Sequence, residues 1–281
     1  MSKNKSVAIR ENENALTTPD YLKTYDGNLG TEDMGSDDLT VPRLKLAQAL
    51  SPEVQDGDLK AGNIFLSLTG QRLDNEGVLR IVPIAYTKEY ILWRPRQDNG
   101  GGILARARRV DTPSGIRFGW DQPNCKFEVK VGGNIPVIWE TKEYIDQDGL
   151  DRWGSEIPGD STSGMAATVH HNYVVSLPDH DNIVAALSMA RSQTKRAKDF
   201  NGILKLGNAP MFARVFDIRV IDEQSKKKNN AKYKNLQIVP AGFVPEESFS
   251  FFKSLAETFA SRSYVIHQDV DEEEATDDGA I

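Results

Sequence analysis

Cysteine is almost absent from this chain, which has 281 residues and a single thiol, Cys125. One thiol excludes an internal disulfide framework and a zinc site made of several cysteines. Long apolar runs are missing as well, because no stretch approaches the ~18 residues of a membrane-spanning helix. The segment from Met1 to Ala15 is polar and lacks the apolar core of a secretory signal. We therefore expect a cytoplasmic protein with no membrane partner.

Signature motifs of the common enzyme classes are also missing. The sequence contains no phosphate-binding G-x-x-x-x-G-K-[ST] loop, no G-x-S-x-G nucleophile turn and no H-E-x-x-H motif. Its glycine run, Gly100–Gly102, lies between strand-like segments and is not followed by Lys and Ser or Thr, which favours a hairpin loop. These absences favour a protein that is not an enzyme and that uses no cofactor.

Metal-binding side chains are few. The adjacent His170 and His171 would point to opposite faces of a strand, so they could not readily share one ion. We expect one of them in the core and the other on the surface. The acids of Asp146–Asp151 resemble a calcium loop, but the glycine of this segment comes too early for that motif. We therefore predict no metal site.

Positive and negative charges are unevenly distributed. The net charge is −7, from 34 basic and 41 acidic residues. Residues 269–281 hold seven of the acids and no base, and residues 1–40 have a net charge of −4. The remaining body, 41–268, therefore has a net charge of +4. A mildly basic body with acidic ends is compatible with a nucleic-acid partner, although the whole-chain charge would argue against one.

Composition divides the chain into three parts. Residues 1–38 are rich in Asn, Asp, Glu, Gly and Thr, which predicts a disordered leader. Residues 269–281 repel one another by their like charges, which predicts a disordered acidic tail. Residues 39–268 between them are expected to form one domain.

Strand signals dominate this domain. The segment Val78–Trp93 is long and rich in β-forming residues, and Pro83 within it indicates an edge or a bulge. Hairpins are expected around Pro178–Asn182 and around the Lys- and Asn-rich loop after Asp222. Two segments, Ser192–Leu206 and Pro245–Arg262, favour helices, the first with Ser192 as N-cap. Many short strands must protect their edges, so we expect a mainly β fold: an OB-like antiparallel barrel with insertions, one internal helix and one C-terminal helix.

Aromatic and basic residues recur together along the expected strands. Tyr86, Lys88 and Tyr90 alternate, so they would share one face of a strand. Single-stranded nucleic acid needs this combination, since bases stack on aromatic rings, at ~1–3 kcal/mol per base, and cations neutralise the phosphates. Ordinary packing of strand aromatics is the structural alternative. The candidate nucleic-acid-binding residues are Tyr86, Lys88, Tyr90, Trp93, Arg94, Arg96, Arg106, Arg108, Trp139, Lys195, Arg196, Lys227 and Tyr233.

The acidic tail is the second candidate site. Its acids are followed by a small apolar terminus, and beside a basic cleft it could occupy that cleft when nucleic acid is absent. Once the cleft is filled, the released tail could recruit partner proteins. Asp277, Asp278 and Ile281 are the candidate partner-binding residues.

With these features together, the chain resembles the single-stranded DNA-binding proteins of bacteriophages. The resemblance implies an OB-fold, a role in coating replication intermediates, and a tail that contacts polymerase, helicase or recombination proteins. Tails of this class often end in an aromatic residue, whereas this sequence has Ile281. The segments that carry the resemblance are Val41–Leu44, Ser51–Val54, Gly62–Asn63, Tyr86–Arg96, Trp139–Tyr144 and 269–281.

The leading hypothesis is a sequence-independent single-stranded DNA-binding protein that acts in phage DNA replication or recombination, within the host cytoplasm. Two alternatives stay open at this point. One is a metal-dependent nuclease that uses Asp and His side chains. The other is a virion or adaptor protein that binds no DNA and docks its acidic tail on a basic partner.

Overall fold

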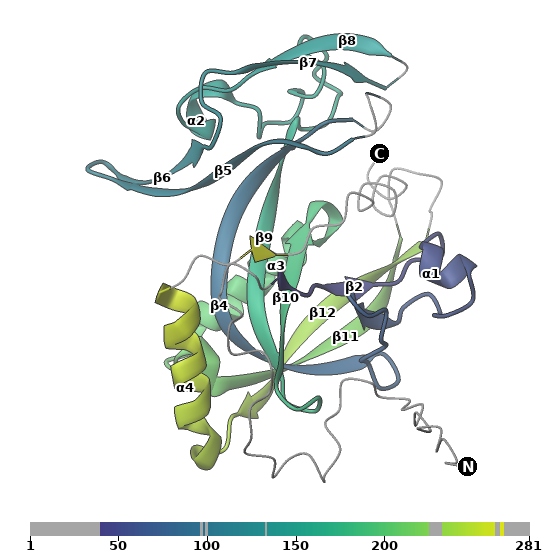
Figure 1. Ribbon diagram of the computed structural model, residues 1–281, viewed down its shortest axis with the longest axis vertical. Helices are drawn as coiled ribbons and strands as arrows, with labels where there is room; N and C mark the ends of the chain where they lie inside the picture. The colour runs from purple at the N-terminus through teal and green to yellow at the C-terminus, as the bar shows by residue number, and fades with distance from the viewer. Residues whose placement is uncertain are drawn as a thin grey trace, which may run out of the picture.

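The computed structural model describes residues 40–95, 98, 101–132, 134–224, 232–261 and 265–266 (Figure 1). The expected leader, 1–38, and the expected acidic tail, 269–281, lie outside these residues. Antiparallel sheets with few helices make up the described part, so the prediction of a mainly β fold is confirmed. No helix among the described residues is long and apolar enough to cross a membrane.

The largest sheet has seven strands, and all of its pairings are antiparallel. Five strands follow one another in the order β10-β9-β4-β11-β12, while β5 pairs with β4 and β6 pairs with β5. Their bounds are β4 (Val78–Trp93), β5 (Ile103–Thr112), β6 (Gly115–Trp120), β9 (Ala167–Leu177), β10 (Ile183–Ala190), β11 (Arg214–Gln224) and β12 (Lys232–Phe243).

Strand β4 connects two branches of this sheet. Its first residues, 78–81, pair with β11, whereas residues 89–93 pair with β5 along the same edge. Its other edge pairs with β9, and both strands extend upward from the lower part of the molecule (Figure 1). The register with β9 shifts between Pro83 and Ala85, which confirms the bulge expected at this proline. A bulge suits proline because proline lacks the N–H that a ladder requires.

The expected barrel is not formed by the described strands, since no ladder between them joins β10 to β12. Residues 42–48 protect both edges instead. The carbonyl of Pro42 accepts a hydrogen bond from the N–H of Ala186 in β10, at 2.7 Å. At the other edge, the side chain of Gln48 exchanges hydrogen bonds of 3.0 and 3.1 Å with the backbone of Lys234 in β12. Edge groups satisfied in this way do not need barrel closure.

Smaller elements surround the main sheet. Three two-stranded pairs are present, of which β1–β13 is parallel and β2–β3 and β7–β8 are antiparallel. The β7–β8 pair lies above the ends of β4 and β9 in Figure 1. Their bounds, with those of the short helices, are β1 (Thr40–Val41), β2 (Leu44–Leu46), α1 (Pro52–Gln55), β3 (Ile64–Leu66), β7 (Lys126–Val131), β8 (Ile135–Glu140), α2 (Ile145–Asp148), η3 (Arg191–Gln193), η4 (Met211–Ala213) and β13 (Val265–Ile266).

Both expected long helices are present as α3 (Thr194–Leu206) and α4 (Glu246–Ser261). The expected cap at Ser192 is wrong, because this residue lies in the 3-10 turn η3 and α3 follows without a side-chain cap. Helix α4 packs its apolar stripe, which includes Phe252 and Phe259, against one face of the main sheet. The stripe therefore belongs to the core of the protein.

Three apolar clusters hold the sheet in place. A lower core, with Tyr173, Phe200 and Phe216, lies between the sheet and α3. An upper core, with Trp120 and Trp139, joins β4, β5 and β6 to the β7–β8 pair. The third cluster lies under α4, on the opposite face of the sheet. Between the lower and upper cores, part of β4 is left only partly covered.

Candidate nucleic-acid interface

An aromatic–lysine face, defined here as Tyr86, Lys88, Tyr90 and Phe118, lies at this partly covered part of β4. The alternation of strand residues places the three β4 side chains on one face, and β6 adds Phe118. The ammonium of Lys88 lies 4.7 Å from the centre of the Tyr90 ring and 4.9 Å from that of Phe118. The two rings meet nearly edge to face, with their centres 5.2 Å apart. This cation–π arrangement holds a positive charge directly beside aromatic rings.

Tyr86 is the most exposed aromatic residue of this face, with 37% of its surface accessible. Its ring packs on Tyr173, with centres 5.0 Å apart, and lies nearly parallel to the ring of His171. Its hydroxyl is 2.8 Å from Nδ1 of His171, and Asn201 of α3 donates a hydrogen bond of 3.4 Å to the same oxygen. Burial raises the pKa of the Tyr86 phenol, so it stays protonated at neutral pH. The ring is therefore held from below while its other side stays accessible.

Three of the predicted binding residues lie apart from this face. Arg106 and Arg108 point to the opposite side of the sheet, where they lie 3.4 and 3.7 Å from the buried carboxylate of Glu89. Trp93 packs there against His170, with ring centres 6.1 Å apart. These three candidates therefore do not share a surface with Tyr86, Lys88 and Tyr90. Cross-strand partners share a face of the sheet. The register pairs Arg108 with Glu89, whose side chain points to the face opposite that of Tyr90.

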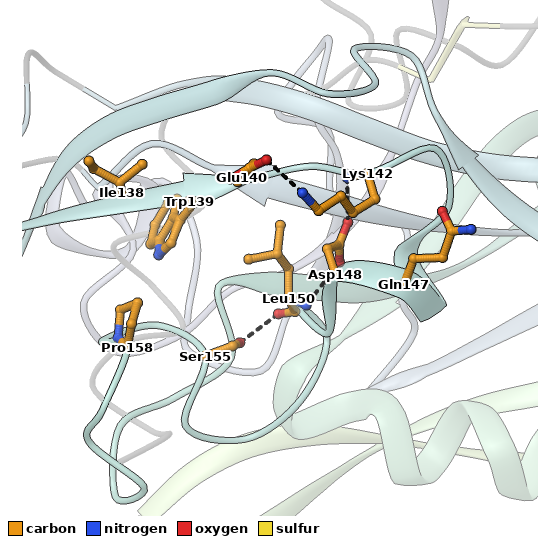
Figure 2. Close-up of a pocket in the computed structure, with 9 residues that line it drawn as sticks. All are labelled: Ile138, Trp139, Glu140, Lys142, Gln147, Asp148, Leu150, Ser155 and Pro158. Carbon is orange, nitrogen blue, oxygen red and sulfur yellow. Dashed lines mark hydrogen bonds and ion pairs between the residues drawn. The ribbon is translucent and has the colours of Figure 1, made fainter.

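Trp139 is a further correction, because it is only 2% exposed and its indole N–H donates to the carbonyl of Glu156. A ring buried in the upper core offers no face on which a base could stack. Its edge contributes to a pocket of about 350 Å³ (Figure 2). The pocket is lined by Ile138, Trp139, Glu140, Lys142, Gln147, Asp148, Leu150, Ser155 and Pro158.

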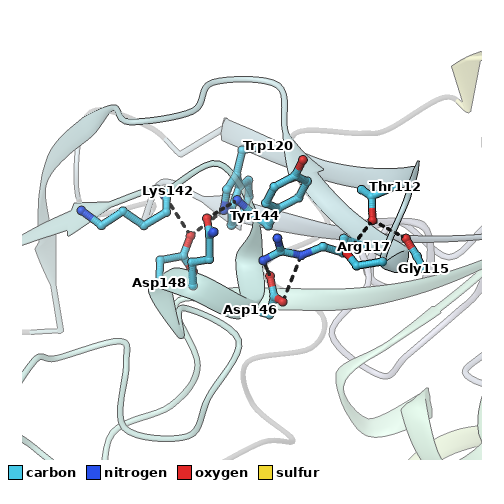
Figure 3. Close-up of polar contacts among 10 residues, drawn as sticks. Thr112, Gly115, Arg117, Trp120, Lys142, Tyr144, Asp146 and Asp148 are labelled. Carbon is cyan, nitrogen blue, oxygen red and sulfur yellow. Dashed lines mark hydrogen bonds and ion pairs between the residues drawn. The ribbon is translucent and has the colours of Figure 1, made fainter.

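The charged groups of this pocket already have partners. Lys142 pairs with Glu140 at 2.6 Å, and this contact lowers the pKa of the Glu140 carboxyl. Asp148 accepts hydrogen bonds from the indole of Trp120 at 2.6 Å and from the backbone of Lys142 at 3.2 Å (Figure 3). Beside it, Arg117 forms a two-pronged ion pair with Asp146. These contacts attach α2 to β6 and β8, so they have a structural role.

Basic residues of α3 separate into two kinds. Lys195 is exposed, whereas Arg196 is bound to the carboxylate of Glu223 on β11. The same carboxylate accepts hydrogen bonds from Tyr233 at 2.9 Å and from Asn235 at 2.8 Å. Arg196 and Tyr233 therefore meet at one acid, where they join α3 to the β11–β12 hairpin.

Among the remaining predicted residues, only Arg94 lies within the described part of the chain. Arg94 forms an ion pair with Asp98, at 2.8 Å, in the segment after β4. Arg96 and Lys227 lie outside the described residues, as do the tail residues Asp277, Asp278 and Ile281.

The two adjacent histidines point to opposite faces of β9, as expected from strand geometry, but both are buried. The expectation that one of them is on the surface is wrong because β9 is a central strand with cover on both sides. Burial, reinforced by Lys88 and Lys198, lowers the pKa of His171 to about 4. Within the described part of the chain, no group of three or more His, Cys, Asp and Glu side chains is placed to hold a metal ion.

Phe118, His171, Lys198 and Asn201 are not among the candidate binding residues given above. Phe118 alternates with Trp120 in a short strand next to several arginines, and this pattern was a usable signal. The other three reach Tyr86 and Lys88 only through the register of β4 with β9 and the packing of α3. No local pattern in the sequence reports those contacts.

The fold and this face define a mainly β protein with an aromatic–cationic surface on an open antiparallel sheet. The sequence profile of the Pam3 phage gp34-like protein family matches residues 11–264, and the chain belongs to this family. The family description agrees with the phage origin expected from the sequence. Comparison with curated proteins and with solved structures gave no match.

Proposed function

We propose that this phage protein binds single-stranded DNA without sequence preference, in DNA replication or recombination, and that the aromatic–lysine face is its main contact surface. The observation that carries this proposal is the ammonium of Lys88 held over two rings, beside the exposed ring of Tyr86. Stacking platforms next to cations are the common feature of proteins that bind single strands. We also propose that the main sheet is an OB-like barrel that stays open between its edge strands, β10 and β12.

The spacing of this face suits a strand of nucleic acid. Tyr86 and Tyr90 are four residues apart on β4, which corresponds to about 13 Å along an extended strand. Lys88 lies between them, so a phosphate near its ammonium can have a base on either side. Stacking would discriminate against duplex DNA, whose bases are already stacked and paired.

Lysines near this face are free to neutralise phosphates. Within the described residues, no ion pair involves Lys88, Lys195 or Lys198. Each phosphate contact on single strands is expected to release counterions and to add about 0.7 to the salt slope of the binding constant. The excess of basic residues in the body, 41–268, acts in the same direction.

The proposal gives the acidic tail a regulatory part. Its acids would compete with DNA for the cationic surface and, once released, would bring Asp277, Asp278 and Ile281 to replication or recombination proteins. Strand β13, which precedes the tail, pairs with β1, and β1 contacts the edge strand β10. The last described residues before the tail therefore lie close to the main sheet. Removal of residues 269–281 should tighten DNA binding.

A binding titration tests the proposal. Fluorescence anisotropy with labelled oligo-dT and with a matched duplex, at salt concentrations from roughly 50 to 500 mM, should show preference for the single strand and a linear decrease of log K with log salt. Tyr86→Ala should weaken binding by roughly 5- to 150-fold, the equivalent of one lost stacked base. Tyr144→Ala is the matched control, because this ring packs on Arg117, away from Tyr86.

Each of four outcomes would contradict the proposal. Affinity that does not change with salt would exclude phosphate contacts. Equal effects of the two tyrosine variants would exclude the aromatic–lysine face as the contact surface. Cleavage of the oligonucleotide after addition of Mg²⁺ or Mn²⁺ would favour a nuclease. Absence of DNA binding, together with a protein partner that survives nuclease treatment, would favour an adaptor.

A further inference from the structure

His171 contains a polar atom whose hydrogen-bonding capacity is unused. The residue is only 5% exposed, and its Nε2 is closed to solvent and has no hydrogen-bond partner among the described residues. Its other ring nitrogen, Nδ1, lies 2.8 Å from the hydroxyl of Tyr86. Buried polar atoms almost always have partners, because each one left unpaired costs about 1–3 kcal/mol. An unused nitrogen directly beneath a candidate binding face therefore calls for a ligand.

A chain of hydrogen bonds ends at the other ring nitrogen of His171, Nδ1. Tyr173 donates its hydroxyl hydrogen to Oδ1 of Asn201 at 2.8 Å, and the amide of Asn201 donates to the oxygen of Tyr86 at 3.4 Å. Among the described contacts of the Tyr86 hydroxyl, the Asn201 amide is a donor, so Nδ1 of His171 is the acceptor available for the Tyr86 hydrogen. A neutral imidazole that accepts at Nδ1 carries its hydrogen on Nε2. The unused atom is thus a donor, and it needs an acceptor.

The charged groups that bear on His171 are both positive. Lys88 faces it from β4 as its cross-strand neighbour, and Lys198 faces it from α3. Tyr86 on β4 and Tyr173 on β9 are the other titratable groups nearby, while β10 places the uncharged Met189 opposite it. Burial and the two lysines hold the pKa of His171 at about 4, so the ring is a neutral donor at pH 7. Two ammonium groups and one buried N–H favour an anion with several acceptor oxygens.

We propose that Nε2 of His171 and the ammonium groups of Lys88 and Lys198 form a phosphate subsite, which holds one phosphodiester of the bound strand between bases stacked on Tyr86 and Tyr90. This inference rests on the proposed function and assigns the backbone contact within that face. A phosphodiester reaches Nε2 only after a neighbouring side chain moves. The two lysines have long, flexible side chains, and the ammonium of Lys88 lies over the rings of Tyr90 and Phe118, from which it can rotate toward a phosphate.

Two substitutions of His171 test the roles of Nδ1 and Nε2 separately. His171→Asn places an amide where Nδ1 was, so it keeps a partner for Tyr86 and loses the distal donor. His171→Gln places its amide nitrogen at the position of Nε2 and keeps that donor. His171→Asn should weaken binding of oligo-dT about 10-fold, the usual effect of a lost hydrogen bond to a charged group, whereas His171→Gln should stay within about threefold of wild type. Urea unfolding of both variants establishes that they are folded.

The backbone of the probe provides an independent readout. Wild type should bind oligo-dT more tightly than a strand with neutral methylphosphonate linkages, and His171→Asn should reduce this difference. Lys88→Gln and Lys198→Gln should each lower the salt slope by about 0.7. Lys253→Gln, on the exposed side of α4, is the matched control and should leave the slope unchanged.

The failure of the subsite and the failure of the proposed function give different results. If wild type binds oligo-dT and Tyr86→Ala weakens it, but His171→Asn and Lys198→Gln bind like wild type, the subsite is wrong and the function stands. If wild type does not bind oligo-dT at all, the proposed function itself is wrong. Equal losses in His171→Asn and His171→Gln, with unchanged discrimination between the two backbones, would also overturn the subsite.

Discussion

His170 should make the fold sensitive to mild acid. The side chain is buried on the face opposite Tyr86, where its Nδ1 lies 3.4 Å from the hydroxyl of Ser188. Burial lowers its pKa to about 3, and the guanidinium groups of Arg43, Arg191 and Arg106 act in the same direction. In the unfolded chain the pKa returns to about 6.5. Between these two pKa values, the unfolded state therefore binds a proton that the folded state does not bind.

The sign and size of the effect follow from this difference. A group whose folded pKa is lowered supplies stability that is complete above the unfolded pKa and is lost as pH falls toward the folded pKa. For His170 this interval extends from about pH 6.5 to about pH 3. Each pH unit inside it costs about 1.4 kcal/mol, so a decrease from pH 7 to pH 5 should remove about 2 kcal/mol of the free energy of unfolding.

Urea unfolding at the two pH values isolates this contribution. Wild type should lose stability between pH 7 and pH 5, and His170→Gln should lose about 2 kcal/mol less, because glutamine does not titrate. A comparison within each variant removes the cost of the substitution itself. If His170→Gln and wild type lose stability equally, the buried neutral state of this histidine is wrong.

Two further predictions concern packing. Trp139→Phe should lower the free energy of unfolding by ~1–3 kcal/mol, because the carbonyl of Glu156 loses its donor. Its affinity for oligo-dT should stay within about twofold of wild type, and a large loss of affinity at unchanged stability would return Trp139 to the binding surface. Phe252→Ala, 3% exposed under α4, should cost ~3–5 kcal/mol in urea unfolding, whereas its neighbour Phe251→Ala, 48% exposed, should change stability by less than ~1 kcal/mol. Equal costs would contradict the packing of α4.

Local patterns in the sequence were sufficient to predict the longest strand and both long helices. The β-rich run at Val78–Trp93, the bulge at Pro83 and both long helices are present where periodicity and turn residues place them. These features depend on neighbours along the chain, so composition within a short window reports them. Barrel closure was not predictable in this way, since it depends on whether two distant edge strands meet. Here Gln48 and Pro42 satisfy those edges without a ladder.

The candidate site was only half predictable for the same reason. Alternation alone places Tyr86, Lys88 and Tyr90 on one face. The side on which Arg106 and Arg108 lie depends on the register of β5 against β4, and a shift of one residue would reverse it. Aromatic residues in strands are equally suited to a core, and the burial of Trp139 is decided by the distant β7–β8 pair.

The pleat of β4 explains why the charge of Lys88 stays free for a ligand. The acid next to it in sequence, Glu89, points to the opposite face, where Asn172 donates to it at 2.8 Å and Arg106 lies at 3.4 Å. An acid on the same face would pair with Lys88 and cancel its attraction for a phosphate. The strand therefore separates opposite charges that the sequence places side by side. On the same face, the cross-strand neighbour of Lys88 is the neutral imidazole of His171, which does not cancel the positive charge of the lysine.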